Sequence, residues 1–280
     1  MTTTTPAADT TTRRGSNHRA SGRRQDLNRL RAFNAAALAL ATLGSASIAE
    51  AGVSAAITWQ TAQTITGDSD VQTAGTLAYA YTFGSSTVSA TTVNGVNFAA
   101  FGISPTNSPV TVGNLTLHES PDYLNPATGL GASGAPYTSL SAGYQSLLGE
   151  GASASLPVTI TVTLAGLTAG RQYSLQWWSS NSSGNTHFGA DLSSTTAYDG
   201  FSNQVTLSST AGGIGQYVVG TFTATGSIEF FNLESPSGSG LTAPLMNALQ
   251  LRDITPTGVP GGAGLAGLLA LGTAGRRRRR

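Results

Sequence analysis

The stretch from residue 55 to residue 252 consists of short runs rich in Val, Thr, Ile, Tyr and Phe, separated by clusters of Gly, Ser, Asn and Pro. β-branched and aromatic residues favour strands, and the intervening residue types favour turns. This spacing leaves little room for helices and predicts an all-β domain, a two-sheet, jelly-roll-like β-sandwich. The expected strands are 56–59, 76–83, 87–93, 96–101, 110–117, 156–164, 172–179, 203–208, 216–224, 227–232 and 248–252.

Two local patterns support these strands. Residues 158–164 alternate Val, Ile, Val and Leu with threonines, which predicts one buried and one polar face. Asn94-Gly95 stands between two β-runs and predicts a tight hairpin. Residues 118–154 are rich in Gly, Ser and Pro, so we expect a long loop there, with a hint of a short helix or edge segment over 144–148.

Charge is segregated along the chain. Residues 1–51 carry seven arginines against three acids, and residues 259–280 carry five arginines and no acid. The middle carries only Arg171 and Arg252 against ten acids, so its net charge is near −8 and nucleic-acid binding is disfavoured. The absence of Cys excludes a disulfide framework, a thiolate zinc site and a cysteine nucleophile.

The N-terminus has the layout of an export signal. Residues 1–32 are polar and rich in arginine, residues 33–48 are uncharged and mostly small or apolar, and Ala49-Glu50-Ala51 forms an A-x-A cleavage pattern. This order predicts a signal peptide over residues 1–51 with a long basic n-region. The secretion machinery would recognise this signal peptide. The alternative is a tail leading into a buried helix, although 33–48 shows no alternation of faces.

The C-terminus combines a motif, a short span and a basic cluster. Val259-Pro260-Gly261-Gly262 opens an apolar run that continues to Gly275, a length barely sufficient for a transmembrane helix. The terminal arginines would stay on the cytoplasmic side. The residues of this predicted sorting signal are Val259, Pro260, Gly261, Gly262, Arg276, Arg277, Arg278, Arg279 and Arg280.

In this order of parts, residues 255–280 resemble the PEP-CTERM sorting signal, and the resemblance implies an exosortase-like processing enzyme as a partner. Gly261-Gly262 stands where that motif has Glu-Pro, so the tail also resembles the GlyGly-CTERM type handled by rhombosortases. A plain membrane anchor is the alternative.

Four central segments, 65–71, 92–98, 215–222 and 247–252, resemble exported bacterial proteins that carry such tails, which implies an envelope location. The last of them is also similar to the final strand of galactose-binding-like and malectin-like jelly rolls, which bind carbohydrate.

One cluster suggests a ligand-binding site: Trp177, Trp178, Asn181, Asn185, His187, Phe188 and Asp191. Neighbouring residues of a strand face opposite ways, so one tryptophan would enter the core and the other would face solvent. An exposed aromatic ring beside amides and a carboxylate suits a sugar. The alternative is that both tryptophans are covered, one by the core and one by the loop at 181–200.

Asp68 and Asp70 alternate in Gly-Asp-Ser-Asp and offer oxygen ligands for Ca²⁺; the alternative is a solvated turn in which aspartate accepts backbone hydrogen bonds. His118 and His187 lie in no metal-spaced pair, and no G-x-S-x-G elbow is present. We therefore expect no catalytic residues, no other metal and no cofactor.

These observations predict a non-enzymatic, exported β-sandwich protein with its folded domain over residues 52–254. It would pass through the inner membrane, be held there by its C-terminal helix, and be sorted to the envelope or the extracellular space as a surface, matrix or biofilm component. The first alternative is a lectin-like module that binds extracellular polysaccharide, and the second is a secreted hydrolase.

Overall fold

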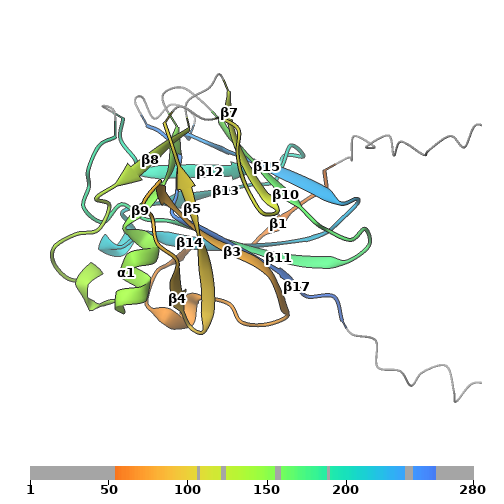
Figure 1. The fold of residues 1–280 in the computed structure, drawn as a ribbon, viewed down its shortest axis with the longest axis horizontal. Helices are drawn as coiled ribbons and strands as arrows, with labels where there is room; N and C mark the ends of the chain where they lie inside the picture. The colour runs from red at the N-terminus through yellow and green to blue at the C-terminus, as the bar shows by residue number, and fades with distance from the viewer. Residues whose placement is uncertain are drawn as a thin grey trace, which may run out of the picture. The chain divides into compact units, whose positions relative to one another are not determined.

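The computed structural model describes residues 54–105, 108–120, 124–154, 159–187, 190–236 and 242–256. Over these residues the chain is all-β and resembles a sandwich, with two large sheets and one small sheet (Figure 1). The predicted signal peptide and sorting motif lie outside the described residues and stay predictions. Among the helices of the described part, none has the length and apolar character needed to cross a bilayer.

The first large sheet has eight strands in the order β1-β14-β11-β17-β3-β5-β4, with β2 beside β14. All its pairs are antiparallel except β3 with β5, which is parallel. The strands are β1 (Thr58–Trp59), β2 (Gln63–Thr64), β3 (Thr76–Ser85), β4 (Thr91–Val93), β5 (Val96–Ile103), β11 (Gln172–Ser179), β14 (Gln216–Thr223) and β17 (Ala248–Asp253).

The second large sheet has six antiparallel strands, and a third sheet has three. In order, the six are β13 (Gln204–Ser208), β12 (Ser194–Tyr198), β15 (Ile228–Glu234), β10 (Thr159–Ala165), β7 (Leu115–Ser120) and β6 (Val110–Val112). The three are β16 (Leu245–Met246), β9 (Glu150–Ala154) and β8 (Leu124–Thr128). The helical elements are α1 (Ala142–Leu148) and the short 3-10 turns η1 (Asp68–Asp70), η2 (Tyr137–Ser139) and η3 (Ala211–Gly213).

The two large sheets enclose one hydrophobic core. The alternation predicted for β10 is confirmed over its described residues, because Ile160, Val162 and Leu164 are fully buried. They share a cluster with Leu175 and Trp177 of the opposite sheet, and Figure 1 shows the two layers. Each such large apolar side chain contributes about 1.5–3 kcal/mol on burial, which makes this interface the main source of stability.

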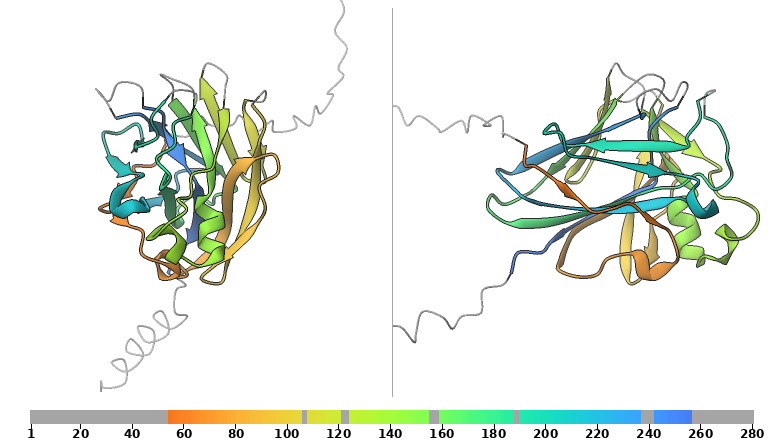
Figure 2. Two further views of the ribbon diagram at one scale, coloured as in Figure 1. Left: turned by 90° about the vertical axis from the view of Figure 1, so that its left-hand side faces the viewer. Right: turned by 180° about the vertical axis from the view of Figure 1, so that it is seen from behind.

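A second core lies on the outer face of the eight-stranded sheet. Tyr144, Leu147 and Leu148 of α1 pack there against Phe98 and Trp178. The helix begins after Ser141, whose hydroxyl accepts a hydrogen bond from the Tyr144 N–H (3.2 Å), as an N-cap does. Figure 2 shows α1 seated at one end of the domain.

The structure corrects the expected loop at 118–154, since β8, η2, α1 and β9 occupy much of it. β8 contains Asn125 and Pro126, and β9 contains Gly151 and Ala152, residue types that disfavour strands. Burial of these segments between the large sheets overrides their weak propensity.

Two turns show where local sequence decides register. The Asn94-Gly95 hairpin is confirmed: β4 pairs with β5, and both turn residues have positive φ (49° and 75°). The single strand expected over 110–117 is instead two, because Gly113 (φ 57°) turns the chain and Val112 pairs with Leu115.

Residues 65–75, here called the strap, cross the outer face of the eight-stranded sheet. Its peptide groups are bound by long polar side chains that rise from β11 and β17. Gln176 Nε2 donates to Asp70 O (2.7 Å), and Gln250 Nε2 donates to Gln72 O (3.1 Å) and to Gln176 Oε1 (2.6 Å). Both glutamines are fully buried, so their amides replace the missing ladder bonds.

Arg252 anchors the end of the strap. Its Nε donates to Ala74 O (2.7 Å), and one Nη donates to Thr73 O (2.8 Å) and Gly75 O (3.0 Å). The side chain is nearly buried, and burial lowers the pKa of the guanidinium from its usual value. Three carbonyls therefore depend on one cation.

We expect Arg252→Met to reduce the free energy of unfolding by about 3 kcal/mol, because the charge-assisted hydrogen bonds from a buried guanidinium to the carbonyls of residues 73–75 are lost. Arg171→Met is the matched control: Arg171 is half-exposed and pairs with Asp253 (2.7 Å), so its loss should cost about 0.5 kcal/mol. Urea unfolding followed by tryptophan fluorescence measures both. Equal losses in the two variants would contradict the anchoring role.

Candidate functional site

The two tryptophans of β11 point to opposite faces of the sheet, as their alternation requires, but neither is exposed. Trp177 lies in the core between the two large sheets and Trp178 in the second core, and both are 0% exposed. Of the two alternatives posed by the sequence, the covered one holds. The structure thus corrects the expectation of an exposed tryptophan on which a sugar could stack.

The cover over Trp178 differs from the expected one. Its indole N–H donates to the Tyr144 hydroxyl (2.9 Å), and its ring meets Phe98 edge to face (5.7 Å between centroids). Burial, followed by the charge of Asp70, raises the pKa of Tyr144 and keeps this phenol neutral. The cover therefore comes from α1 and β5 rather than from the loop at 181–200.

The polar residues of the predicted cluster form local hydrogen bonds and backbone bridges. Asn181 is buried and its Nδ2 donates to Asn185 O (2.9 Å), while Asn185 Nδ2 donates to Gly129 O (2.8 Å). His187 forms an isolated bridge with Ala190, and burial lowers its pKa. Phe188 lies outside the described residues. Asp191 is exposed and bridges to Thr242 through its backbone.

Asp68 and Asp70 build a turn. Asp70 accepts hydrogen bonds from Thr66 N–H (2.6 Å) and Gly67 N–H (2.9 Å), and Asp68 accepts one from the Ser141 hydroxyl (2.6 Å). The alternative of a hydrogen-bonded turn therefore describes Asp70. In the described part of the chain, no three His, Asp or Glu side chains come together as metal ligands would.

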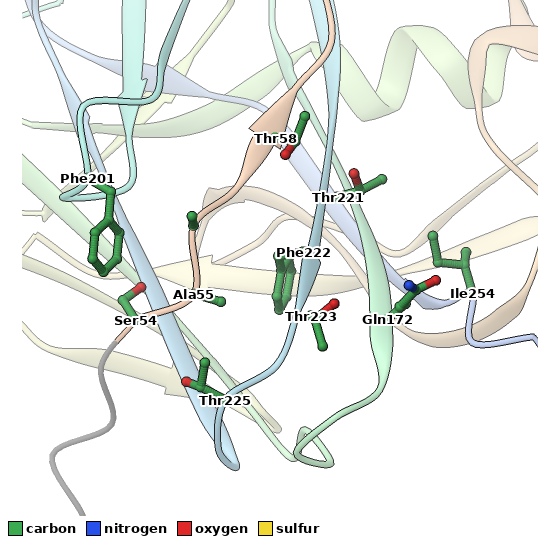
Figure 3. A pocket seen from close by; sticks show the side chains of 11 residues that line it. Ser54, Ala55, Thr58, Gln172, Phe201, Thr221, Phe222, Thr223, Thr225 and Ile254 are labelled. Carbon is green, nitrogen blue, oxygen red and sulfur yellow. The ribbon is translucent and has the colours of Figure 1, made fainter.

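A groove that the sequence did not reveal lies where the described chain begins and ends. It holds about 590 Å³ and opens between β1, β14 and the turn that joins β12 to β13 (Figure 3). Its lining residues are Ser54, Ala55, Ala56, Thr58, Gln172, Phe201, Thr221, Phe222, Thr223, Thr225 and Ile254.

One wall of the groove is the arm, residues 54–57, which passes from one large sheet to the other. Two buried carboxylates of the six-stranded sheet side hold it. Ala55 N–H donates to Glu229 Oε2 (2.5 Å), and Ile57 N–H donates to Asp199 Oδ2 (2.8 Å). This explains why β1 is shorter than expected: the arm's N–H groups bind side chains before the ladder with β14 begins.

Asp199 also shapes the turn that carries Phe201. Burial alone disfavours its charged form, but hydrogen bonds from Asn203 Nδ2 and from the N–H groups of Phe201, Ile57 and Asn203 outweigh it. The pKa of Asp199 therefore lies below its ordinary value. The turn leaves the Phe201 ring 45% exposed at the rim of the groove.

The chemistry available in the groove is that of binding. Its described lining residues supply five hydroxyl groups, the Gln172 amide and the Phe201 ring, and none of them is ionisable. The lining thus offers no general acid or base and no charge to a ligand. It suits a neutral molecule that carries hydroxyl groups.

The only hint of this site in the sequence is Asp199-Gly200-Phe201-Ser202-Asn203, a turn with a large apolar residue at its centre. Turn residues are usually small or polar, so an aromatic ring there is unusual. Which strand edge the turn faces depends on the sheet order, which the sequence does not contain.

Comparison with known proteins found no matching family model, no matching curated protein and no matching solved structure.

We expect Asp199 to make the domain sensitive to acid. A carboxyl group whose pKa is lower in the folded than in the unfolded chain stabilises the fold above the unfolded value, about 3.9 for Asp. That contribution is lost as the pH falls through the lower, folded value. Thermal unfolding between about pH 6 and pH 2 should show this loss, and Asp199→Asn should flatten the acid slope.

Asp191→Asn, which replaces an exposed carboxylate, is the matched control for this pH series. An acid slope unchanged in Asp199→Asn would show that the arm is held by other contacts.

Proposed function

We propose that this chain is exported and sorted to the bacterial cell envelope, where its β-domain acts as a non-catalytic surface or matrix component. The supporting observation is where the described chain begins and ends. Ser54 and Ile254 line the same groove, and Figures 1 and 2 show the first and last described segments at one end of the domain. The predicted export signal precedes one of these ends and the predicted sorting tail follows the other.

This arrangement suits a tethered domain. A tail attached at one end leaves the outer faces of the sheets free, so processing at either terminus need not disturb the core. The described residues carry two arginines and nine carboxylates, a net charge of −7, which favours solubility outside the cell. The same proposal includes a jelly-roll topology for the sandwich and an exosortase-like or rhombosortase-like enzyme that processes the tail.

The test is intact-mass and terminal-peptide analysis of the protein recovered from its native envelope and medium. We expect the mature chain to begin near Ala51 and to end near residues 260–262. Deletion of the host's exosortase-like or rhombosortase-like gene should leave the C-terminus intact. If the protein still ends at Arg280 in every fraction of the unmodified host, the tail is a plain membrane anchor. If the recovered protein still begins at Met1, the proposed cleavage of a signal peptide is wrong.

A second candidate function is binding of a neutral carbohydrate, and the groove is the observation that favours it. Its volume falls within the usual range of ligand sites. The exposed Phe201 ring can stack on the apolar face of a sugar, while Gln172 and the surrounding hydroxyls can bind its hydroxyl groups. In this proposal the sugar would bind in the groove, and the buried Trp177 and Trp178 would take no part.

Phe201→Ala should weaken binding of neutral oligosaccharides about tenfold, the equivalent of roughly 1.4 kcal/mol for a lost stacking contact. A glycan array identifies the ligand and an NMR titration measures its affinity. Phe230→Ala is the control, because Phe230 is a similarly exposed ring outside the groove. If no neutral glycan binds at millimolar concentration, this second function is excluded.

A further inference from the structure

A second hollow adjoins the groove at Thr58. It holds about 310 Å³ and lies between β1 and the start of β13. Its lining residues are Ile57, Thr58, Trp59, Ser202, Asn203 and Gln204. Thr58 lines both spaces, and so does the turn from β12 to β13, with Phe201 in the groove and the next three residues in the second hollow. The two spaces therefore follow one another along the arm and β1.

The turn that serves both spaces contains a strained residue. Gly200 has φ 83° and Ser202 has φ 82°. Glycine or asparagine is the usual residue at such an angle, so serine at position 202 keeps its side chain at a cost in free energy. Strained residues of this kind persist only where their surroundings hold them, and they gather at ligand-binding sites.

Buried Asp199 holds the turn in this shape. Its carboxylate accepts hydrogen bonds from the N–H groups of Phe201 (2.8 Å) and Asn203 (3.3 Å) and from Asn203 Nδ2 (2.8 Å). The same carboxylate accepts the N–H of Ile57, next to Thr58. One side chain thus fixes both the turn and the arm before a ligand arrives, and a preformed site loses less conformational freedom on binding.

The second hollow offers the same chemistry as the groove. Ser202 and Gln204 are exposed there, so their hydroxyl and amide groups can bind a ligand. The Trp59 ring lies over β14 and meets Phe231 edge to face (5.9 Å between centroids). It fits because Gly220 has no side chain, since a Cβ there would lie 2.6 Å from the ring. None of the six lining residues is ionisable.

The two spaces together are longer than a single sugar ring. Residues 54–59 line them in succession, and six residues of extended chain span about 17 Å. Each space combines an aromatic ring with an amide, Phe201 with Gln172 in the groove and Trp59 with Gln204 in the second hollow. A chain of sugars repeats apolar ring faces and hydroxyl groups in the same way, so this repetition suits linked sugars.

We propose that the groove and the second hollow form one site for a neutral oligosaccharide of two or more units, which crosses Thr58 from Phe201 to Gln204. This inference rests on the second function proposed above and adds the length of the ligand to it. An acidic polysaccharide is disfavoured, because the described lining holds no cation and the described residues carry a net charge of −7.

The dependence of affinity on ligand length tests the extended site. The purified full-length protein is titrated, with NMR detection, against glucose, galactose, mannose and N-acetylglucosamine and against the linear oligomers of each with two to five units. In the series that binds, we expect the affinity to rise about tenfold or more between one unit and four units, the equivalent of an added contact region.

Two exposed glutamines provide a matched pair of variants. Gln204→Ala should weaken binding of the four-unit ligand several-fold and leave binding of the single sugar unchanged, because only the longer ligand reaches both spaces. Gln63→Ala removes an exposed glutamine that lines neither space and should change neither affinity. Gln204 is exposed, so the fold should tolerate the change, and an unaltered melting temperature verifies this.

Equal affinities for one and four units, or a four-unit affinity unchanged in Gln204→Ala, would overturn the extended site. If Phe201→Ala still weakens binding in that case, the groove binds one sugar and the second function stands. An equal loss in Gln63→Ala would also overturn the extended site, because the ligand would then bind elsewhere. If no series binds at millimolar concentration, the extended site and the second function are both wrong.

Discussion

Peptide groups that leave a ladder still need hydrogen-bond partners, and in the arm and the strap this domain supplies several of them from side chains. Glu229 and Asp199 bind the arm, Gln176 and Gln250 bind the strap, and Arg252 binds the strap's end. Each of these side chains rises from a strand or its end and reaches a segment distant in sequence. The sheets thus hold together through polar contacts that a count of apolar burial would miss.

Asn247 serves the same purpose between the large sheets and the small one. Its Nδ2 donates to the carbonyls of Leu148, Glu150 and Ser180, and its Oδ1 accepts the Ser180 N–H (2.6 Å). One fully buried amide therefore ties the end of α1 to β9 and β11. Because its partners are backbone groups, its position depends on the fold more than on neighbouring side chains.

Much of the strand content could be predicted from the sequence, since β11 begins and ends at the expected residues and the Asn94-Gly95 turn forms its hairpin. Local patterns suffice there because strand alternation and positive φ are properties of a few consecutive residues. β8 and β9 could not be predicted, because tertiary burial makes strands of sequences rich in Gly, Ala and Pro. The prediction of an exposed tryptophan was wrong for the same reason. Trp178 is covered by Tyr144 and Phe98, which lie 34 and 80 positions away in the sequence.

Ser54 and Ile254 lie on opposite sides of one groove at the same end of the domain, and this has a consequence for how the domain can be combined with other proteins. A domain whose two ends lie on the same side of its surface can be placed within a loop of another protein, or have its ends joined by a short linker and new ones opened elsewhere. The natural place for new ends would be an exposed turn such as Asn94-Gly95, far from the arm in the sheet order. In evolutionary terms, such a module can be moved between chains as a unit.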